Sequence, residues 1–268
     1  MSFDIAAPYG QLITTTVRLI TWNVWGRFGP WERRETSIRA GLDGHDPDIV
    51  ALVEAWDGQG ARLGLPYHVF EGGYEIDGVR SGLAVLSRWP IGAHEVLRLS
   101  GEGDSAGNVL RAVIDGPRGA IQIYVAALAW RLEHSGERQR QVREATAFIA
   151  GTQHRRYPTV LCGDFNADPD SDEMRMLTGK SAPAAPGLVF YDAWATAGDG
   201  PDGGHTWANA NPWAAPALWP NRRIDYVLSA WPRRGGAGHP VHCEVIGIEP
   251  VDGVVPSDHY GVLADLRY

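Results

Sequence analysis

Polar residues that suit a phosphate or a hard cation follow a short apolar stretch in the middle of the chain. Residues 159–162 (TVLC) are typical of a buried strand, and residues 163–166 (GDFN) come directly after them. In an extended backbone Asp164 and Asn166 project to one face, and Phe165 points the other way into packing. A carboxylate and a carboxamide side by side could bind a cation or a phosphate. Turn-forming residues follow, so this segment alone is equally consistent with a plain turn.

Other strand-like segments carry residues of the same chemical kind at or near their ends. These residues are Asn23, Glu54, Asp225, Asp258 and His259. A carboxylate buried in a strand costs several kcal/mol unless it is paired or binds a cation. One such acid is commonly a satisfied core group, but four acids together are difficult to explain in this way. With two asparagines and a histidine, they indicate an oxygen-ligand site for magnesium with a general base beside it.

The elements that must position these residues are mostly strands. We expect strands over residues 17–24, 48–54, 81–87, 109–114, 121–127, 159–162, 224–229 and 260–266. We expect helices over residues 32–42 and 136–150, with Ser135 as the N-cap of the second, and a shorter helix from residue 171. Because strands outnumber helices and the two are interleaved, the pattern favours packed sheets with outer helices over a simple βαβ repeat.

The composition is that of an ordinary globular protein. The chain has 268 residues, with 44% apolar and 21% charged residues and a net charge of −8. An acidic chain is not built to coat nucleic acid nonspecifically, although a local patch or a bound metal could still hold a phosphate. The two cysteines, Cys162 and Cys243, have no zinc-site spacing. No signal peptide or membrane span is evident, so we expect a cytoplasmic protein.

Six segments, taken in order, resemble the endonuclease/exonuclease/phosphatase superfamily. This is the fold of pancreatic-type deoxyribonucleases, AP endonucleases, sphingomyelinases and inositol polyphosphate 5-phosphatases. The matching segments are residues 20–24 (ITWNV), 48–54 (DIVALVE), 81–91 (SGLAVLSRWPI), 163–166 (GDFN), 223–227 (RIDYV) and 257–259 (SDH). The resemblance implies a four-layer α/β sandwich, in which two mixed sheets pack face to face with outer helices. It also implies one domain over residues 1–268, with residues 1–16 as an N-terminal extension.

The resemblance implies a metal site on three residues. Glu54 would be the main magnesium ligand, supported by Asn23, and Asp258 would hold a metal or the attacking water. Manganese could replace magnesium. The metal would neutralise charge on the phosphate.

The resemblance also implies catalytic roles at the second half of the chain. Asp164 would orient or deprotonate the attacking water, or assist the leaving group. Asn166 would donate to a phosphate oxygen and stabilise the transition state. His259 would act on the scissile phosphate as acid or base, with Asp225 fixing its tautomer.

The chain departs from the family pattern at Ala127. Many members carry a histidine that contacts the phosphate at this strand end, and an alanine side chain cannot donate a hydrogen bond or a proton. Another residue, such as His205, His134 or Arg111, could reach in. Alternatively the substrate differs from the usual phosphodiester, or activity is reduced.

The segment His205-Thr206-Trp207 lies where family members often present a Thr-Trp pair near the substrate. The tryptophan could stack on a base or pack on a lipid or sugar face, or it could be a loop anchor. We therefore treat Arg111, His205 and Trp207 as candidate substrate-binding residues.

The leading hypothesis is a magnesium-dependent hydrolase of phosphoester bonds, acting as a phosphodiesterase or nuclease on nucleic acid or a small molecule. One alternative is a phosphomonoesterase that acts on a phosphorylated small molecule or lipid head group. A third reading is a non-catalytic binding protein that keeps the fold, and Ala127 is its only support. The sequence carries no signal for a particular oligomeric state.

Overall fold

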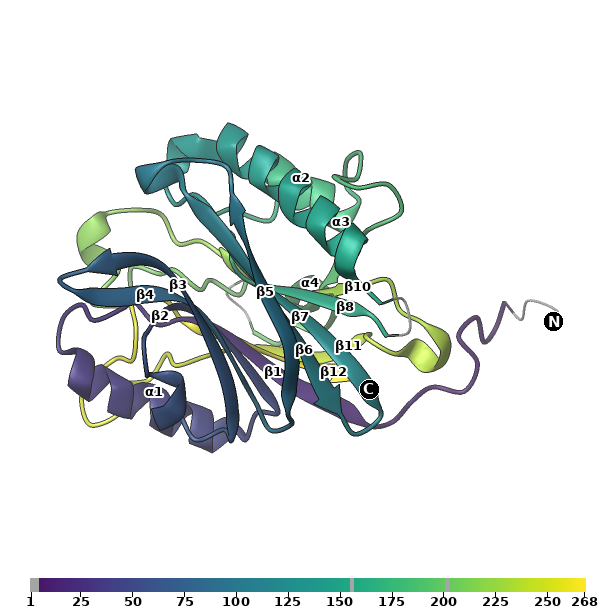
Figure 1. Ribbon diagram of the computed structural model, residues 1–268, viewed down its shortest axis with the longest axis horizontal. Coiled ribbons are helices and arrows are strands. Elements are labelled where there is room, and N and C mark those ends of the chain that lie inside the picture. Colours follow the sequence, from purple (N-terminus) through teal and green to yellow (C-terminus); the bar gives the residue numbers. More distant parts are fainter. Residues whose placement is uncertain (1–4, 155–156, 201–202) are drawn as a thin grey trace.

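Two six-stranded mixed sheets form the centre of the fold (Figure 1). The computed structural model describes residues 5–154, 157–200 and 203–268. The first sheet has the order β11-β12-β1-β2-β4-β3 and the second β5-β6-β7-β8-β10-β9. Only β1–β2 and β7–β8 are parallel neighbours in the described ladders, and the other pairs are antiparallel.

The strands of the first sheet are β1 (Thr16–Asn23), β2 (Ile49–Trp56), β3 (Tyr67–Ile76), β4 (Val79–Ser87), β11 (Pro240–Ile246) and β12 (Gly261–Arg267). Those of the second are β5 (Ile91–Leu99), β6 (Gly107–Gly116), β7 (Gly119–Ala127), β8 (Thr159–Asp164), β9 (Phe190–Asp192) and β10 (Asp225–Ala230). The helices are α1 (Trp31–His45), α2 (Ser135–Thr152), α3 (Asp172–Thr178) and α4 (Ala193–Ala197). Short 3₁₀ turns are η1 (Gly60–Arg62), η2 (Gly103–Ser105), η3 (Leu132–His134), η4 (Ala215–Ala217) and η5 (Arg234–Gly236).

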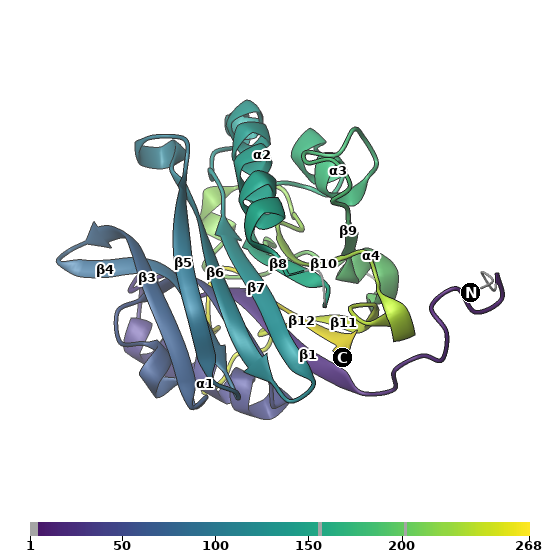
Figure 2. The same cartoon turned by 45° about the vertical axis from the view of Figure 1, so that its right-hand side comes forward.

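Helices cover the outer faces of both sheets, which makes the expected four layers. In Figures 1 and 2, α1 lies on one side of the sandwich, and α2 and α3 lie on the other. Ile38 and Leu42 of α1 pack on the outer face of the first sheet. Val142 and Ile149 of α2 pack on the outer face of the second. The predicted four-layer α/β sandwich is thus confirmed.

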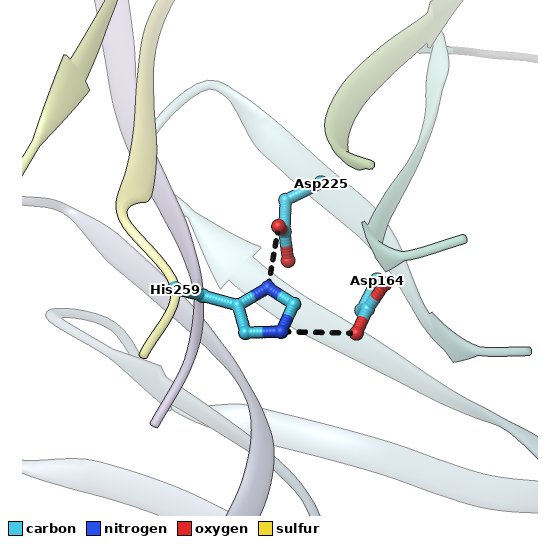
Figure 3. Close-up of side chains that lie close together, drawn as sticks. All are labelled: Asp164, Asp225 and His259. Carbon is cyan, nitrogen blue, oxygen red and sulfur yellow. Dashed lines mark hydrogen bonds and ion pairs between the residues drawn. The ribbon is translucent and has the colours of Figure 1, made fainter. Parts of the chain in front are cut away.

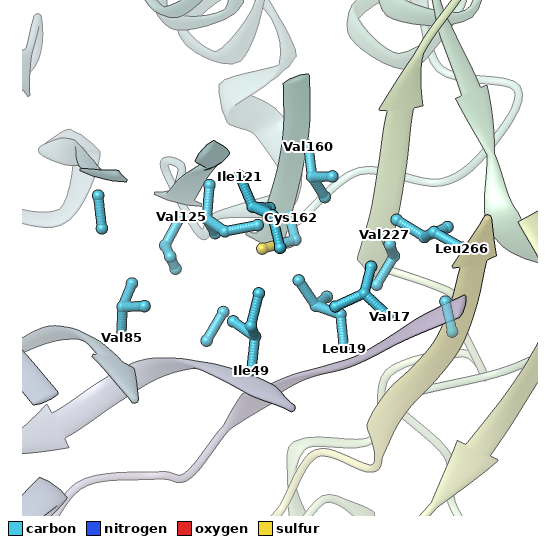
Figure 4. Packing of buried hydrophobic residues seen from close by; sticks show 14 of the residues in the cluster. Val17, Leu19, Ile49, Val85, Ile121, Val125, Val160, Cys162, Val227 and Leu266 are labelled. Atoms are coloured by element: carbon cyan, nitrogen blue, oxygen red, sulfur yellow. The ribbon is translucent and has the colours of Figure 1, made fainter. Parts of the chain in front are cut away.

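The central core lies between the two sheets (Figure 4). Leu19 and Ile49 from the first sheet meet Val125, Val160 and Val227 from the second. Each fully buried side chain of this kind stabilises the fold by about 1.5–3 kcal/mol. Because both faces of these strands are covered, their sequences are nearly continuous apolar runs, which is why the sequence pattern detected them.

The strands that the sequence pattern did not predict are β3, β5, β9 and β11. All four are edge strands, and in β3, β5 and β11 exposed positions break the apolar pattern. In β5 the polar residues His94 and Glu95 are exposed, and β9 is only three residues long. The prediction for Ser135 was wrong, because Ser135 is already inside α2 and its hydroxyl donates to Glu173 Oε2 at 2.9 Å.

The described part of the predicted N-terminal extension contacts the turn at Gly235. The backbone N–H of Ile13 donates to Gly235 O at 2.8 Å, and Gly235 N–H donates to Tyr9 O at 2.7 Å. Residues 1–4 of the extension lie outside the described residues. In the part of the chain that the structure describes, no helix has both the length and the apolarity needed to cross a membrane.

Candidate active site

The parallel strands of both sheets end at the same edge of the sandwich, and the predicted polar residues meet there. The first sheet contributes Asn23 at the end of β1 and Glu54 near the end of β2. The second contributes Asp164 at the end of β8 and Asp225 at the start of β10, which pair in register. The loop before β12 adds Asp258 and His259. Strand ends from two sheets thus converge on one site.

Asn23 connects the two sheets through its carboxamide. Its Nδ2 donates to Glu54 Oε1 at 3.1 Å and to Asp164 Oδ2 at 3.0 Å. Its Oδ1 accepts the backbone N–H of Trp25 at 3.0 Å. Both the oxygen and the nitrogen of the amide therefore form hydrogen bonds. Asn23 holds two carboxylates in position, a role beyond the expected one of supporting a metal ion.

Glu54 leaves the regular alternation of β2 through a local distortion. The register between β2 and β4 shifts between Leu52 and Ala55, and Glu54 itself has φ of 56°. A left-handed conformation costs a non-glycine residue about 1–2 kcal/mol, and such strain concentrates at functional sites. The distortion lets the carboxylate reach Asn23. Burial raises the pKa of Glu54, and the hydrogen bond from Asn23 opposes that shift.

His259 lies between two aspartates (Figure 3). Its Nδ1 is 2.9 Å from Asp225 Oδ2, and its Nε2 is 3.9 Å from Asp164 Oδ2. The backbone is held as well, because the His259 carbonyl accepts the indole N–H of Trp22 at 3.0 Å. Burial lowers the pKa of His259, but Asp225 and Asp164 outweigh this effect and hold the pKa well above its ordinary value. The geometry is that of an imidazole oriented by one carboxylate and facing another.

Thr206 positions Asp225 and was not singled out as a functional residue by the sequence. Its Oγ1 accepts the backbone N–H groups of Ile224 and Asp225, each at 3.1 Å, and its carbonyl accepts Tyr260 N–H at 2.7 Å. The fully buried hydroxyl thus joins the loop before β10 to the loop before β12. The available signal was its place beside Trp207 in the His-Thr-Trp segment.

Thr206→Val is expected to destabilise the protein by about 1–3 kcal/mol, because two buried N–H groups lose their acceptor. Thr206→Ser keeps the hydroxyl and is the matched control, expected to lie closer to wild type. Chemical denaturation measures the difference. Equal stability of the valine and serine variants would contradict the assigned role.

Asp164 and Asn166 form a turn and not a continued strand. β8 ends at Asp164, and Asn166 has φ of 51°, a left-handed conformation that asparagine tolerates well. The expectation that both residues project from one strand face was therefore wrong. Asn166 N–H donates to Asp164 Oδ1 at 2.9 Å, and its Nδ2 donates to Leu128 O at 3.2 Å. Phe165 packs in the core beneath α2, as predicted.

Burial raises the pKa of Asp164 to about 6, and the neighbouring charge of Asp225 acts in the same direction. Burial likewise raises the pKa of Asp258 to about 7, an effect that His259 opposes and Glu54 reinforces. The charged form of each carboxylate is unfavourable, because each is buried beside further negative charge. A cation in the cluster would relieve this cost.

Arg34 supplies fixed positive charge behind the site. The buried guanidinium donates to five backbone carbonyls, which belong to Val24, Trp25, Gly26, Phe28 and Pro256. It therefore ties the loop after β1 to the loop that carries Asp258. Burial lowers the pKa of Arg34 to about 10, while Asp258 and Glu54 favour its charged form.

Three other residues considered from the sequence do not reach the cluster. Arg111 lies on the face of β6 toward α2, where it pairs with Glu95 at 2.9 Å and donates to Thr152 O. His205 lines a separate cavity of about 790 Å³ with Trp194 and Tyr260. For His134, no contact with the cluster is found in the described part of the chain.

Trp207 and Ala127 do lie at the site. The Trp207 ring packs edge-on against His259, with centroids 5.1 Å apart and an angle of 74°. Ala127 pairs in register with Asp164 across β7 and β8. The methyl group thus stands directly beside the Asp164 carboxylate and adds no polar group there.

The donor set fits a divalent cation. Ligand atoms of Asp164, Asp225 and His259 all lie within 4.8 Å of one another. Asp225 and His259 already bind each other, however, and magnesium prefers oxygen ligands. The buried carboxylates of Glu54 and Asp258, which lie close enough for Glu54 to raise the pKa of Asp258, are therefore the better match for a hard cation.

Comparisons with known proteins agree with this fold. A model of the Endonuclease/Exonuclease/phosphatase family matches residues 20–259. D. rerio TDP2 complexed with a single-strand DNA product superposes with a TM-score of 0.75 at 19% identity, over 95% of this chain and 100% of that one. The human Nocturnin catalytic domain with bound sulfate gives 0.67 at 19% identity, over 94% of each chain.

A family protein from Leptotrichia buccalis gives a TM-score of 0.71 at 15% identity, over 94% of this chain and 100% of that one. Among curated protein sequences none matches this chain. At these identities the structural likeness establishes the fold, and the family match covers most of the chain. The chain therefore belongs to the endonuclease/exonuclease/phosphatase family.

Proposed function

We propose that this protein is a magnesium-dependent phosphodiesterase that cleaves nucleic acid. The observation that carries the proposal is His259, which Asp225 orients at 2.9 Å and which faces Asp164 at 3.9 Å, beside Asn23 and Glu54. Phosphoester cleavage needs a positioned base, a proton donor and compensation of developing negative charge. Residues of all three kinds lie together at this edge of the sandwich.

His259 would provide the positive charge and the proton. Asp225 holds the imidazole through Nδ1, so that Nε2 points to Asp164 and the space beside it. Because its pKa is well above the ordinary value, the ring is protonated near neutral pH. The Nε2–H can then donate to a phosphate oxygen as charge develops, and it can deliver a proton to the leaving oxygen.

Asp164 would orient and deprotonate the attacking water. Its pKa of about 6 lies close to neutral pH, where a general base is most effective. Asn166 N–H and Asn23 Nδ2 hold the two carboxylate oxygens in place. Asn166 uses its Nδ2 on Leu128 O, and the carboxamide has a second N–H that can donate to a phosphate oxygen.

Glu54 and Asp258 would hold the magnesium ion, with manganese as a substitute. When bound, the ion would neutralise charge on the phosphate. Asn23 keeps the Glu54 carboxylate in position, and Ser257 Oγ donates to Asp258 Oδ1 at 3.2 Å. The raised pKa values of both acids support the proposal, because a cation would remove the cost of their buried charges.

A row of aromatic rings beside His259 supports nucleic acid as the substrate. Trp207 packs on His259, Trp219 contacts Trp207 at 5.5 Å, and Trp130 stacks on Trp219 at 6.0 Å with an angle of 24°. Trp130 is 42% exposed, so the row leads from the site to solvent. Aromatic surfaces of this kind bind the bases of single strands. D. rerio TDP2, a structural neighbour, is described with a single-strand DNA product.

A substrate panel tests the proposal. The protein is incubated with magnesium, manganese or a chelator, and with single-stranded DNA, bis(p-nitrophenyl) phosphate or p-nitrophenyl phosphate. We expect metal-dependent cleavage of both diesters and little cleavage of the monoester. Preference for the monoester would indicate a phosphomonoesterase. If no substrate is turned over and calorimetry detects no magnesium binding, both enzyme hypotheses are excluded and the non-catalytic binding protein is the hypothesis that remains.

A further inference from the structure

A row of register neighbours crosses the second sheet at the edge that carries the active site. Arg98 pairs with Asn108 between β5 and β6, and Asn108 pairs with Ala127 between β6 and β7. Ala127 then pairs with Asp164, and Asp164 with Asp225. Register neighbours project from the same face of a sheet. Arg98 and Asn108 therefore lie on the same face of the sheet as Asp164 and Asp225, on the far side of Ala127.

The Arg98 and Asn108 side chains are held together. Arg98 Nη1 donates to Asn108 Oδ1 at 2.8 Å, and Arg98 Nη2 donates to the carbonyl of Gly72 in β3. Gly73 lets the carboxamide lie close to β3, because a Cβ at position 73 would be 2.8 Å from Asn108 Nδ2. The guanidinium and the amide N–H groups are thus fixed in one place between the two sheets.

Arg98 differs from four buried arginines of the second sheet and the segments around it. Arg111, Arg138, Arg222 and Arg223 each form an ion pair, with Glu95, Glu173, Asp168 and Asp192. Arg98 is exposed, and in the described part of the chain no carboxylate lies within ion-pair distance of it. Asn108 Nδ2 likewise donates to no acceptor among the described residues. An anion from outside can therefore bind to both groups.

The small side chain at position 127 leaves space between this pair and the catalytic residues. Two strand spacings of about 4.8 Å separate the Cα atoms of Asn108 and Asp164, about 10 Å in total. Ala127, whose methyl group is the smallest side chain, occupies the strand between them. A phosphate at Asp164 and a second one beside Asn108 would be too far apart for a pyrophosphate, and Arg98 lies one strand further from Asp164. Because these side chains project into the same space, two phosphates held at their tips can be successive phosphates of a nucleotide strand.

We infer that Arg98 and Asn108 form a second phosphate subsite, which binds the phosphate next to the scissile one in a single-stranded nucleic acid. The inference rests on the proposed function for the identity of the substrate. It assigns the guanidinium as the charge that attracts the phosphate and the Asn108 amide as a second donor. It also gives Ala127 a role, because a larger side chain there would lie between the two phosphates.

Binding in the absence of metal tests the subsite without turnover. The probe is a fluorescein-labelled single-stranded oligodeoxynucleotide in chelator, measured by fluorescence anisotropy over a range of salt concentrations. Asn108→Asp is the sharpest variant, because a carboxylate can still accept from Arg98 and so keeps the contact between β5 and β6. It neutralises the guanidinium and repels a phosphate. We expect binding to weaken by about tenfold or more.

Loss of one phosphate contact should also lower the salt dependence of binding, by about 0.7 in the slope of log K against log salt. Arg98→Gln should show the same change. Arg143→Gln is the matched control, since Arg143 is an exposed arginine on α2 that donates to Gln139 O. Wild-type affinity and slope in both Asn108→Asp and Arg98→Gln, with unchanged melting temperatures, would overturn the inference.

Kinetics separate this inference from the proposed function. With magnesium, the variants are compared on a dinucleotide that has one phosphate and on a strand that has two. The expected effect falls on KM more than on kcat, and it is at least about fivefold larger for the longer substrate. Equal losses on both substrates would refute the subsite while leaving the proposed hydrolase intact. Absence of turnover in the wild type would refute the hydrolase, and the binding result would still decide the subsite.

Discussion

His259→Asn is expected to lower kcat on a phosphodiester by about 10³–10⁴-fold with the fold intact, a loss on the scale of general acid–base catalysis. Asparagine places an amide N–H near the position of Nδ1 and can still donate to Asp225, which now binds the ring at 2.9 Å. It has no group at the position of Nε2, the nitrogen that faces Asp164. The substitution therefore removes the proton donor while it keeps the buried partner of Asp225 satisfied.

The measurement is steady-state cleavage of bis(p-nitrophenyl) phosphate and of a single-stranded oligonucleotide, with the melting temperature as a check on folding. His259→Gln is the informative companion, because its longer amide reaches toward the Nε2 position and leaves Asp225 without its donor. Both variants should be strongly impaired. A His259→Asn enzyme within about tenfold of wild type would remove His259 from the proposed mechanism.

Glu54→Gln is expected to weaken magnesium binding by at least about 100-fold, since losing even an outer contact to a metal ligand typically costs 10–100-fold. Glutamine has nearly the same shape, and its Oε1 can accept the hydrogen bond that Asn23 now donates at 3.1 Å. What is lost is the negative charge. Isothermal titration calorimetry with magnesium measures the affinity directly and does not depend on turnover.

The same variant should change thermal stability in opposite directions with and without metal. Burial raises the pKa of Glu54, so its carboxylate is less favourable in the folded protein than in the unfolded chain. At pH values above that raised pKa the metal-free glutamine variant should therefore melt at a higher temperature than wild type. With excess magnesium the order should reverse, because only wild type gains the free energy of metal binding. Wild-type magnesium affinity in Glu54→Gln would exclude Glu54 as a ligand.

Local pattern determined much of the fold. Strands such as β2 and β8 are covered on both faces, so their residues are apolar or small except for an acid at or near the carboxyl end, and this run is visible without any tertiary information. α2 was visible because one face packs on the second sheet and the other faces solvent. The edge strands β5 and β11 were not visible, because their mixed burial produces no regular period.

For the candidate site, too, the sequence indicated the types of residue, whereas the structure was needed to show which residues they contact. The sequence marked Asn23, Glu54, Asp164 and His259 because polar residues at the ends of apolar runs are costly without a function. It also proposed Arg111 as a substrate contact, and the structure places that arginine beneath α2 with Glu95. An arginine in a strand has the same local signature whether its side chain meets a substrate or a neighbouring acid.

What the sequence alone determined is therefore the set of chemical groups and the strands that carry them, since both depend on residue type and on short-range periodicity. Only the tertiary structure decided which groups meet. It placed the Thr206 hydroxyl where it accepts the backbone N–H of Asp225, and it brought the Glu54 carboxylate to Asn23. It also aligned Arg98 and Asn108 with Asp164 in the strand register, with Ala127 between them. The physical reason is that strand register and sheet packing bring together residues far apart in the chain, such as Asn23 and His259, which lie 236 positions apart and meet around Asp164. No local pattern encodes those pairings.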